Sequence, residues 1–299
     1  MAMSTEPDPS YSVPGACPGW AEYGDRRGIP LLYHHGMPGA HPEAALLDRS
    51  ARAQGFRIIV PDRPGIGLTP NRGLRAVSDL VQDHCRLLDQ LGVDRCHQAG
   101  WSSGGPHALA MAALAPQRVR GVTLMASYTH FSEVAEGGPA PAPPIALEDR
   151  LPALLTWLTG LIGWTQRLLP WVYLRSFQGL CAPVDRNLLR QSSVRNQFMA
   201  AQRQAFSQGM AGPRQDLALQ SRDWGFRLAQ VTAPVRLYQG LQDPFVSPEH
   251  SEHLRLHLGR CNLVPLVDEA HLFPLREAFQ NLWFKGLRDQ LERADVGPG

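Results

Sequence analysis

Short apolar runs alternate with longer amphipathic stretches along most of the chain. The short runs end at Gly, Pro or Asp turn residues, which is typical of β-strands. The runs that we predict as strands are residues 30–34, 56–60, 96–100, 122–126, 235–239 and 262–267. The stretches with helical periodicity are residues 42–54, 77–91, 104–115, 248–258 and 274–291. This alternation predicts an α/β fold, in which a mostly parallel sheet is covered by helices on both faces.

The alternation is interrupted between about residues 128 and 227. The interruption includes a Pro-rich stretch, GGPAPAPP, at residues 137–144, followed by helical segments rich in Leu, Trp and Gln. The strand–helix rhythm resumes at Val235. We therefore expect a single core interrupted by one insertion. The predicted parts are a flexible N-terminal lead-in at 1–19, an α/β core formed by 20–127 and 228–299, and an inserted helical cap at 128–227.

An uncharged stretch at residues 151–166 requires comparison with a membrane span. It is shorter than the roughly 20 apolar residues that a spanning helix needs, and Pro152, Gly160 and Gly163 interrupt it. We interpret it as a buried or cleft-lining pair of helices, and we expect no stable membrane insertion. Contact of this surface with lipid is the alternative. The N-terminal residues lack the charged and apolar regions of a secretory signal.

Composition narrows the function classes. The 299 residues carry a formal net charge of +2, with 43% hydrophobic and 19% charged residues. This excludes a disordered polyelectrolyte, and the balanced charge argues against a nucleic-acid-binding protein. The five cysteines are scattered, and none forms a CxxC pair. We therefore expect neither a disulfide framework nor a zinc site. This cysteine pattern is typical of a reducing compartment, so we expect a cytoplasmic location.

The most informative motif is Gly-Trp-Ser-Ser-Gly at residues 100–104, a match to the pattern GxSxG. It follows a predicted strand and begins a predicted helix, the context of a nucleophile elbow that exposes a serine hydroxyl. Small residues around Ser102 avoid clashes in the bend, and the helix N-terminus favours a developing negative charge. A plain strand-to-helix turn is the alternative for this motif taken alone.

Two further residues follow in the order that a serine triad on this scaffold requires, which is Ser, then acid, then His. Asp243 comes directly after one predicted strand and His271 follows the last strand. Both therefore belong at the carboxyl ends of strands, where an open α/β sheet places its site. We expect His271 to accept the Ser102 proton and Asp243 to orient the imidazole. Asp268 or Glu269 is the alternative acid.

The loop after the first predicted strand, His-Gly-Met-Pro-Gly at residues 35–39, is a candidate for oxyanion binding. The second donor of such sites comes from this loop and pairs with the amide after the nucleophile. Because Pro38 has no N–H to donate, the expected oxyanion hole consists of the backbone amides of Met37 and Ser103.

These motifs together resemble the α/β-hydrolase superfamily. The resemblance rests on HGMPG, PDRPGIG at 61–67, GWSSGG, GLQD and the final AHLFP, and it covers the chain from about Trp20 to the last helix, apart from the insertion. It implies the triad Ser102, Asp243 and His271, the oxyanion amides of Met37 and Ser103, and a cap in the position of the insertion. A serine at the elbow argues against the branches that use aspartate there, the haloalkane dehalogenases and epoxide hydrolases. Ala270 departs from the glycine that the family often has before its histidine.

The substrate site is expected to be largely apolar with few polar anchors. The residues expected to contact the substrate are His34, His35, Gly36, Trp101, Tyr128, Trp157, Trp164 and Phe245. For His34 and for the tryptophans of the insertion, packing is the alternative role. No motif for a nucleotide, flavin or pyridoxal cofactor is present, so none is expected. His250, His253 and His257 share one helix face, but their spacing is not that of a metal motif; we expect a solvated face and no metal.

We therefore predict a cofactor-independent serine hydrolase that cleaves a carboxylic ester, thioester or lactone of a small, largely apolar substrate. The alternative is another reaction of the same fold, such as C–C bond hydrolysis, perhydrolysis or a lyase or cyclase step. A protein that binds small molecules without catalysis is the third hypothesis. The sequence carries no signal for the oligomeric state.

Overall fold

A computed structural model describes residues 18–130 and 152–295 of the chain, with the backbone alone at 152–159 and 292–295. Most of the predicted lead-in, residues 1–19, lies outside the described residues, and so does the Pro-rich stretch at 137–144.

Seven strands form one sheet in the order β1-β3-β2-β4-β5-β6-β7. Their bounds are β1 Trp20–Gly24, β2 Ile29–His34, β3 Phe56–Pro61, β4 Cys96–Trp101, β5 Val119–Met125, β6 Val235–Gly240 and β7 Cys261–Leu266. Strand β1 pairs antiparallel with β3, whereas the other neighbouring strands are parallel. The predicted mostly parallel sheet is thus confirmed, and β1 is a strand that we did not predict.

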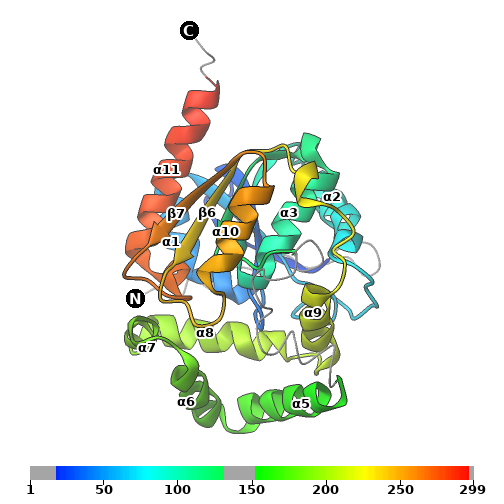
Figure 1. Cartoon of the computed structure of the whole chain (residues 1–299), viewed down its shortest axis with the longest axis vertical. Coiled ribbons are helices and arrows are strands. Elements are labelled where there is room, and N and C mark those ends of the chain that lie inside the picture. The colour runs from blue at the N-terminus through cyan, green and yellow to red at the C-terminus, as the bar shows by residue number, and fades with distance from the viewer. Residues whose placement is uncertain (1–17, 131–151, 296–299) are drawn as a thin grey trace.

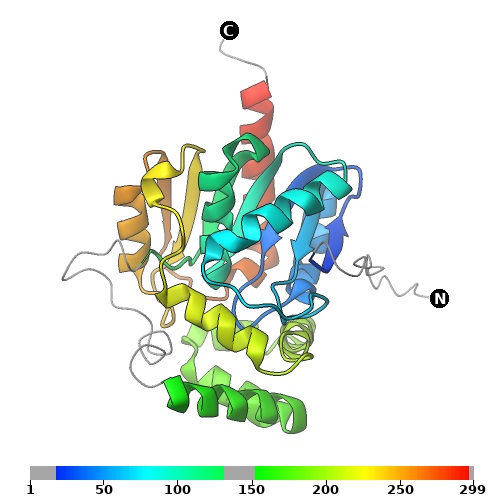
Figure 2. The ribbon, with the colours of Figure 1, turned by 90° about the vertical axis from the view of Figure 1, so that its right-hand side faces the viewer.

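Helices cover both faces of the sheet, as the alternation predicted. One face packs against α2 (Val81–Gln90), α3 (Gly105–Leu114) and α10 (Pro248–His257), and the other against α1 (Asp48–Ala53) and α11 (Glu277–Asp295). The two layers are visible on either side of the strands in Figures 1 and 2. The apolar positions of the 77–91 periodicity face the core, because Val81, Leu87 and Leu88 are buried. Each face therefore has its own apolar cluster against the sheet.

Within the described residues, five α-helices lie between β5 and β6. They are α5 Pro152–Leu168, α6 Pro170–Leu180, α7 Pro183–Leu188, α8 Ser192–Ala205 and α9 Ala211–Ser221. We call them the insertion. Figure 1 shows them together at one end of the sheet, with α8 and α9 nearest the core and α5 and α6 farthest from it. Helix α8 packs on the 3₁₀ helix η1 (His41–Leu47), and α5 packs on α6. None of the helices in the described residues has the length and apolar character to cross a membrane.

Candidate active site

Ser102 lies in a strained turn between β4 and α3. Its φ is +54°, a left-handed conformation that non-glycine residues rarely adopt. The two glycines of the motif make the turn possible: a Cβ on Gly100 would lie 2.5 Å from the Gly104 carbonyl oxygen, and one on Gly104 would clash with the His34 carbonyl oxygen. Ser102 itself is only 4% exposed. The strand–turn–helix context predicted for this motif is thus present, with the serine held in an uncommon backbone conformation.

Asp243 and His271 come together at the same end of the sheet. The Nδ1 atom of His271 lies 2.7 Å from Oδ2 of Asp243. The other carboxylate oxygen, Oδ1, accepts the backbone N–H groups of Phe245 at 2.8 Å and Val246 at 2.9 Å. These amides fix the carboxylate in the loop after β6. The pairing fixes the tautomer of the imidazole, so that Nε2 of His271 is the atom able to take up a proton.

The electrostatics of His271 fit a general base. Burial alone would lower its pKa, but the charge of Asp243 and the hydrogen bond to it outweigh burial, and the pKa of His271 is raised above its ordinary value. Trp101 also contacts the histidine: its indole Nε1–H donates to the His271 carbonyl oxygen at 3.1 Å, and the ring centroids lie 5.5 Å apart. Because Trp101 is the neighbour of Ser102, this hydrogen bond links the serine turn to the histidine loop.

Asp268 and Glu269, the alternative acids, do not pair with the His271 ring. Glu269 forms an ion pair with Arg276 at 2.8 Å, and Asp268 is exposed. Neither carboxylate shares a hydrogen bond with the His271 ring, whose Nδ1 pairs with Asp243. The geometry therefore favours Asp243 over both.

The candidate oxyanion loop lies beside the serine. A Cβ on Gly36 would lie 3.7 Å from the Ser102 Cβ and 3.4 Å from the Trp101 ring. Met37 follows Gly36 directly, and Ser103 is the second residue of the 3₁₀ turn Ser102–Gly104. Helix α8 of the insertion contacts the same loop, because Gln202 donates its side-chain N–H to the Pro38 carbonyl oxygen.

A buried glutamate, Glu43, binds the backbone of this loop. Oε1 of Glu43 accepts the Tyr33 hydroxyl at 2.7 Å, and both of its carboxylate oxygens lie within 3.2 Å of the Gly36 amide nitrogen. Burial raises the pKa of Glu43 to about 7, although the hydrogen bonds from Tyr33 and Gly36 oppose that shift. Glu43 was not predicted from the sequence, because an acidic residue near the start of a helix is also an ordinary surface feature.

Arg63 holds the opposite side of the loop. Its guanidinium donates to the carbonyl oxygens of His35 and Gly36, each at 2.8 Å, and to Oδ2 of Asp216 at 2.7 Å. Asp216 lies on α9, and both side chains of the ion pair are buried. Burial would raise the pKa of Asp216, but the charge of Arg63, together with the hydrogen bonds and charge that Arg63 and His107 supply, holds this pKa below its ordinary value. One buried ion pair thus connects the insertion to the candidate oxyanion loop.

The insertion also contacts the histidine loop. Asp185 on α7 accepts the backbone N–H groups of His271 at 3.0 Å and Leu272 at 3.1 Å. Its side chain is buried. Sequence reasoning did not single out Asp185, Arg63 or Asp216, since their roles depend on contacts between distant segments.

Apolar side chains surround the site. Phe245 packs edge-on against His271 with ring centroids 5.2 Å apart, and Phe177 of α6 stacks on Phe245 at 5.6 Å. Met37, Tyr128 and Phe245 belong to one apolar cluster together with Leu217 of α9. Two predicted contact residues, Tyr128 and Phe245, are therefore close together.

Other predicted contact residues lie elsewhere. Trp164 is 54% exposed on α5 and is not brought to the serine, and the side chain of Trp157 lies outside the described residues. The ring of His34 is buried, with Nε2 3.0 Å from Oε1 of Gln98. The His84 ring of α2 lies tilted against it and the His107 ring of α3 lies stacked beside it. His34 thus has the packing role. The His35 ring bonds to the adjacent Gly36 carbonyl oxygen at 2.9 Å.

The three histidines of α10 do not form a uniformly solvated face. His250 is buried at 1% exposure and His257 is exposed. The expectation of a solvated face is therefore wrong for His250, because its side of the helix packs near Thr129 and the Tyr128 ring. Across the described residues, no group of three or more potential ligands is arranged to hold a metal ion.

Comparison with known proteins agrees with this architecture. A family model for the alpha/beta hydrolase fold matches residues 29–277. The chain is 25% identical over 261 residues to the uncharacterised hydrolase YcgS of Bacillus subtilis, covering 82% of this chain and 86% of that protein. It is 30% identical over 235 residues to a 2-hydroxy-6-oxononadienedioate/2-hydroxy-6-oxononatrienedioate hydrolase of Cupriavidus pinatubonensis, covering 74% and 69% of the two chains.

Solved structures share the fold over nearly the whole chain. A hydrolase from Pseudomonas aeruginosa PA01 superimposes with a TM-score of 0.68 at 22% identity, covering 95% of this chain and 99% of that one. The enol-lactonase from Burkholderia xenovorans LB400 superimposes with a TM-score of 0.66 at 16% identity, covering 91% and 95%. The chain belongs to the α/β-hydrolase fold family, and it is an enzyme of that family.

Proposed function

We propose that the protein is a cofactor-independent serine hydrolase acting on carboxylic esters, thioesters or lactones. The observation that carries this proposal is the 2.7 Å pairing of His271 with Asp243 next to the strained turn that holds Ser102. In this proposal Ser102 is the nucleophile, His271 the general base and acid, and Asp243 the residue that orients His271.

The reaction follows two steps. The Ser102 oxygen attacks the substrate carbonyl carbon while Nε2 of His271 takes the hydroxyl proton, and the collapse of the tetrahedral intermediate transfers this proton to the leaving group. A water molecule then attacks the acyl-enzyme, again with His271 as the base, and the acid is released. The amides of Met37 and Ser103 stabilise the oxyanion in both steps. Glu43 and Arg63 are positioning residues for the loop that carries the Met37 amide.

The surroundings favour a small apolar substrate. Phe177, Phe245 and Tyr128 supply apolar surface near His271, and we propose that the insertion acts as a cap over this site. Arg63, whose guanidinium lies beside the candidate oxyanion loop, already bonds to two carbonyl oxygens and to Asp216, and is therefore not available to a substrate carboxylate. The four described cysteines are free thiols, which supports the expected cytoplasmic location.

C–C bond hydrolysis is the second candidate. It is favoured by relatives named as 2-hydroxy-6-oxononadienedioate/2-hydroxy-6-oxononatrienedioate hydrolases, which are 30% identical to this chain. Those names denote dicarboxylic substrates, which need cationic partners. The occupied guanidinium of Arg63 argues against such substrates here.

A panel of p-nitrophenyl esters of increasing acyl chain length tests the proposal, alongside a 2-hydroxy-6-oxo dienoate. We expect ester turnover by the wild type and a loss of about 10⁴-fold or more in Ser102→Ala. Turnover of the dienoate with no turnover of any ester would favour the second candidate. Tight ester binding without any turnover would favour a non-catalytic binding protein.

A further inference from the structure

Charge is distributed unevenly between the insertion and the rest of the chain. The insertion, residues 152–221, contains seven arginines and two acidic residues, Asp185 and Asp216, which gives it a net charge of +5. Because the whole chain has a formal net charge of +2, the remaining residues carry −3. The near balance of the whole sequence therefore conceals a cationic insertion on an anionic remainder.

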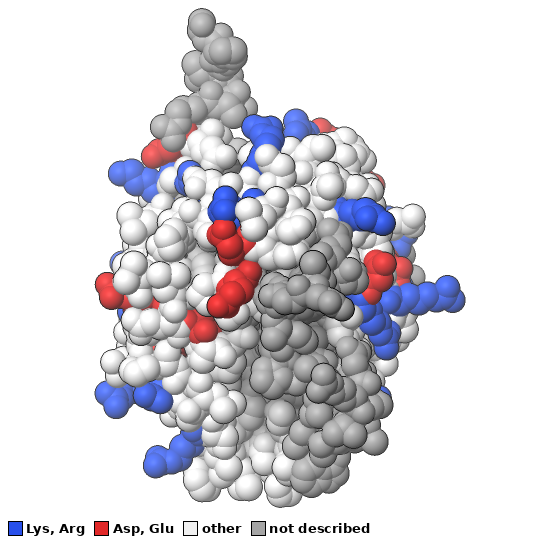
Figure 3. Space-filling view, in the orientation of Figure 1, with Lys and Arg blue, Asp and Glu red and all other residues white. Residues whose placement is uncertain are grey.

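The two acidic residues do not neutralise the surface of the insertion. Asp185 is fully buried, and its two oxygens accept backbone amides of the histidine loop. Asp216 is buried in its ion pair with Arg63. The seven arginines are all exposed or half-buried. None of them forms an ion pair with an acidic side chain in the described ranges. In Figure 3 the described residues at the lower end of the molecule, outside the grey area, show cationic and uncharged side chains.

The insertion also exposes a cluster of large apolar side chains. Among the described residues, seven of the twelve large apolar side chains with high exposure lie between positions 161 and 180. They are Leu161, Ile162, Trp164, Leu168, Leu169, Trp171 and Leu180. Trp171 is 68% exposed. We call this surface of α5 and α6 the outer face; Figure 1 shows both helices in the layer farthest from the sheet. An apolar cluster of this kind marks an interaction surface.

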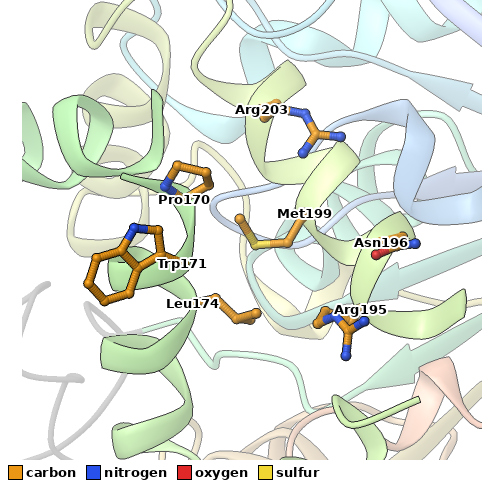
Figure 4. A pocket seen from close by; sticks show the side chains of 7 residues that line it. All are labelled: Pro170, Trp171, Leu174, Arg195, Asn196, Met199 and Arg203. Carbon is orange, nitrogen blue, oxygen red and sulfur yellow. The ribbon is translucent and has the colours of Figure 1, made fainter. Parts of the chain in front are cut away.

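A groove beside the outer face is lined by both cationic and apolar side chains. It has a volume of about 220 Å³ and is lined by Trp171 and Leu174 of α6 and by Met199, Arg195 and Arg203 of α8. Figure 4 shows the Trp171 and Leu174 side chains on one side and the two arginines on the other. Two guanidinium groups next to an apolar wall suit a phosphate group attached to an apolar chain.

We propose that the outer face docks on the surface of an anionic lipid bilayer. Trp171 and its apolar neighbours lie at the boundary between headgroups and acyl chains, and the arginines bind lipid phosphates. The helices lie in the plane of the interface and do not cross it. Residues 152–184 contain Arg167 and Arg175 and no acidic residue, so the part that enters the headgroup layer carries no charge that an anionic membrane would repel.

The charge and the apolar cluster together favour this partner over two others. Docking onto a second copy through the outer face would bring two insertions of net charge +5 together. Nucleic acid would complement the arginines but would leave tryptophan and leucine side chains against a polar, highly charged surface. An anionic bilayer complements both the charge and the apolar surface.

Flotation of the full chain with vesicles tests the proposal. We compare pure phosphatidylcholine vesicles with vesicles that contain 30 mol% phosphatidylglycerol (roughly the range in which surface charge attracts basic segments). We expect binding to the anionic vesicles that weakens in 0.5 M NaCl (about 4 Å Debye length) and little binding to the neutral ones. Intrinsic tryptophan emission should shift to the blue on binding.

Two pairs of double variants separate the apolar and ionic contributions. Leu168→Ser/Trp171→Ser should weaken partitioning at least tenfold, whereas Leu256→Ser/Leu282→Ser, which removes apolar side chains of similar exposure from α10 and α11, should not. Arg167→Gln/Arg175→Gln should weaken it about 30-fold, whereas Arg26→Gln/Arg27→Gln, exposed at the other end of the sheet, should not.

Melting temperatures must stay within a few degrees of the wild type for each variant used. Equal flotation with neutral and anionic vesicles, absence of flotation with either, or equal loss in the control variants would overturn the proposal. Salt-sensitive binding to an oligonucleotide together with absent vesicle binding would also overturn it and would indicate nucleic acid instead.

Discussion

Asp185 accepts the backbone N–H of His271 at 3.0 Å, although the two residues belong to different parts of the fold. Asp185 lies on α7 of the insertion and His271 follows the last strand of the sheet. The insertion therefore contributes directly to the position of the candidate base. It also holds the candidate oxyanion loop through the ion pair of Asp216 with Arg63.

Replacement of Asp185 by asparagine should lower turnover and shift its pH dependence. Asparagine offers one acceptor oxygen for the two amides of His271 and Leu272, and we expect kcat to fall about tenfold. The negative charge of Asp185 also raises the pKa of His271, so its removal should move the acidic limb of kcat/KM to lower pH. Asp268 is exposed and close in sequence to His271, so Asp268→Asn is the control. This variant should change neither kcat nor the pH at which the acidic limb lies. An unchanged pH profile in Asp185→Asn with normal folding would contradict this role.

The Asp243→Asn variant should show the largest shift of the acidic limb. His271 must be neutral to accept the Ser102 proton, so activity rises with pH through the pKa of His271. In the wild type Asp243 raises this pKa above the ordinary value, and the limb should lie above about pH 6.5. The asparagine variant should lose about 10⁴-fold in kcat, with its residual activity reaching a plateau at lower pH. A limb that stays in place would show that another group controls it.

Glu43 should make the protein less stable at alkaline pH. Burial raises the pKa of Glu43 to about 7 from an ordinary value of 4.5. The folded state therefore holds this proton more tightly than the unfolded state. The resulting stabilisation is complete below about pH 4.5 and is lost as the pH rises through about 7. Urea unfolding should give a free energy about 2.5 kcal/mol lower at pH 8 than at pH 5 from this group alone. The Glu43→Gln variant should lack this component, and an equal pH dependence in both proteins would argue against it.

The buried pair of Arg63 and Asp216 allows stability and catalysis to be separated. Arg63→Met leaves an unpaired buried carboxylate and should lower the free energy of unfolding by about 3–5 kcal/mol. The double variant Arg63→Met/Asp216→Leu removes both charges and should recover most of that loss. Ester turnover should stay low in the double variant, because Arg63 also binds the carbonyl oxygens of His35 and Gly36. Full recovery of turnover would show that the arginine is needed for stability alone.

The parallel part of the sheet was predictable because its strands are short apolar runs that end in turn residues. Strand β1 was not predictable, because its sequence, WAEYG, is five residues long and carries no run of β-branched residues. The order of Ser102, Asp243 and His271 placed them at one end of the sheet, where the structure pairs the last two. Their catalytic roles stay a prediction.

Contacts between distant segments lay beyond the sequence. The hydrogen bonds of Glu43 with Tyr33 and of Asp185 with His271 depend on packing that no local pattern encodes. The orientation of Trp164 was similarly hidden, because a helix that is apolar on several sides does not indicate which side faces the core. The net charge of +2 gave no sign of the cationic insertion, since an overall sum contains no positions.

The central claim is that Ser102 is an activated nucleophile, and labelling with a fluorophosphonate tests it most directly. The folded wild-type protein should gain one phosphonate, located by peptide mass spectrometry on Ser102, and labelling should be faster above the pKa of His271 than below it. Ser102→Ala should not be labelled, and His271→Ala should be labelled far more slowly. A folded wild-type protein that remains unlabelled, or that is labelled at another residue with Ser102 unmodified, would contradict the account.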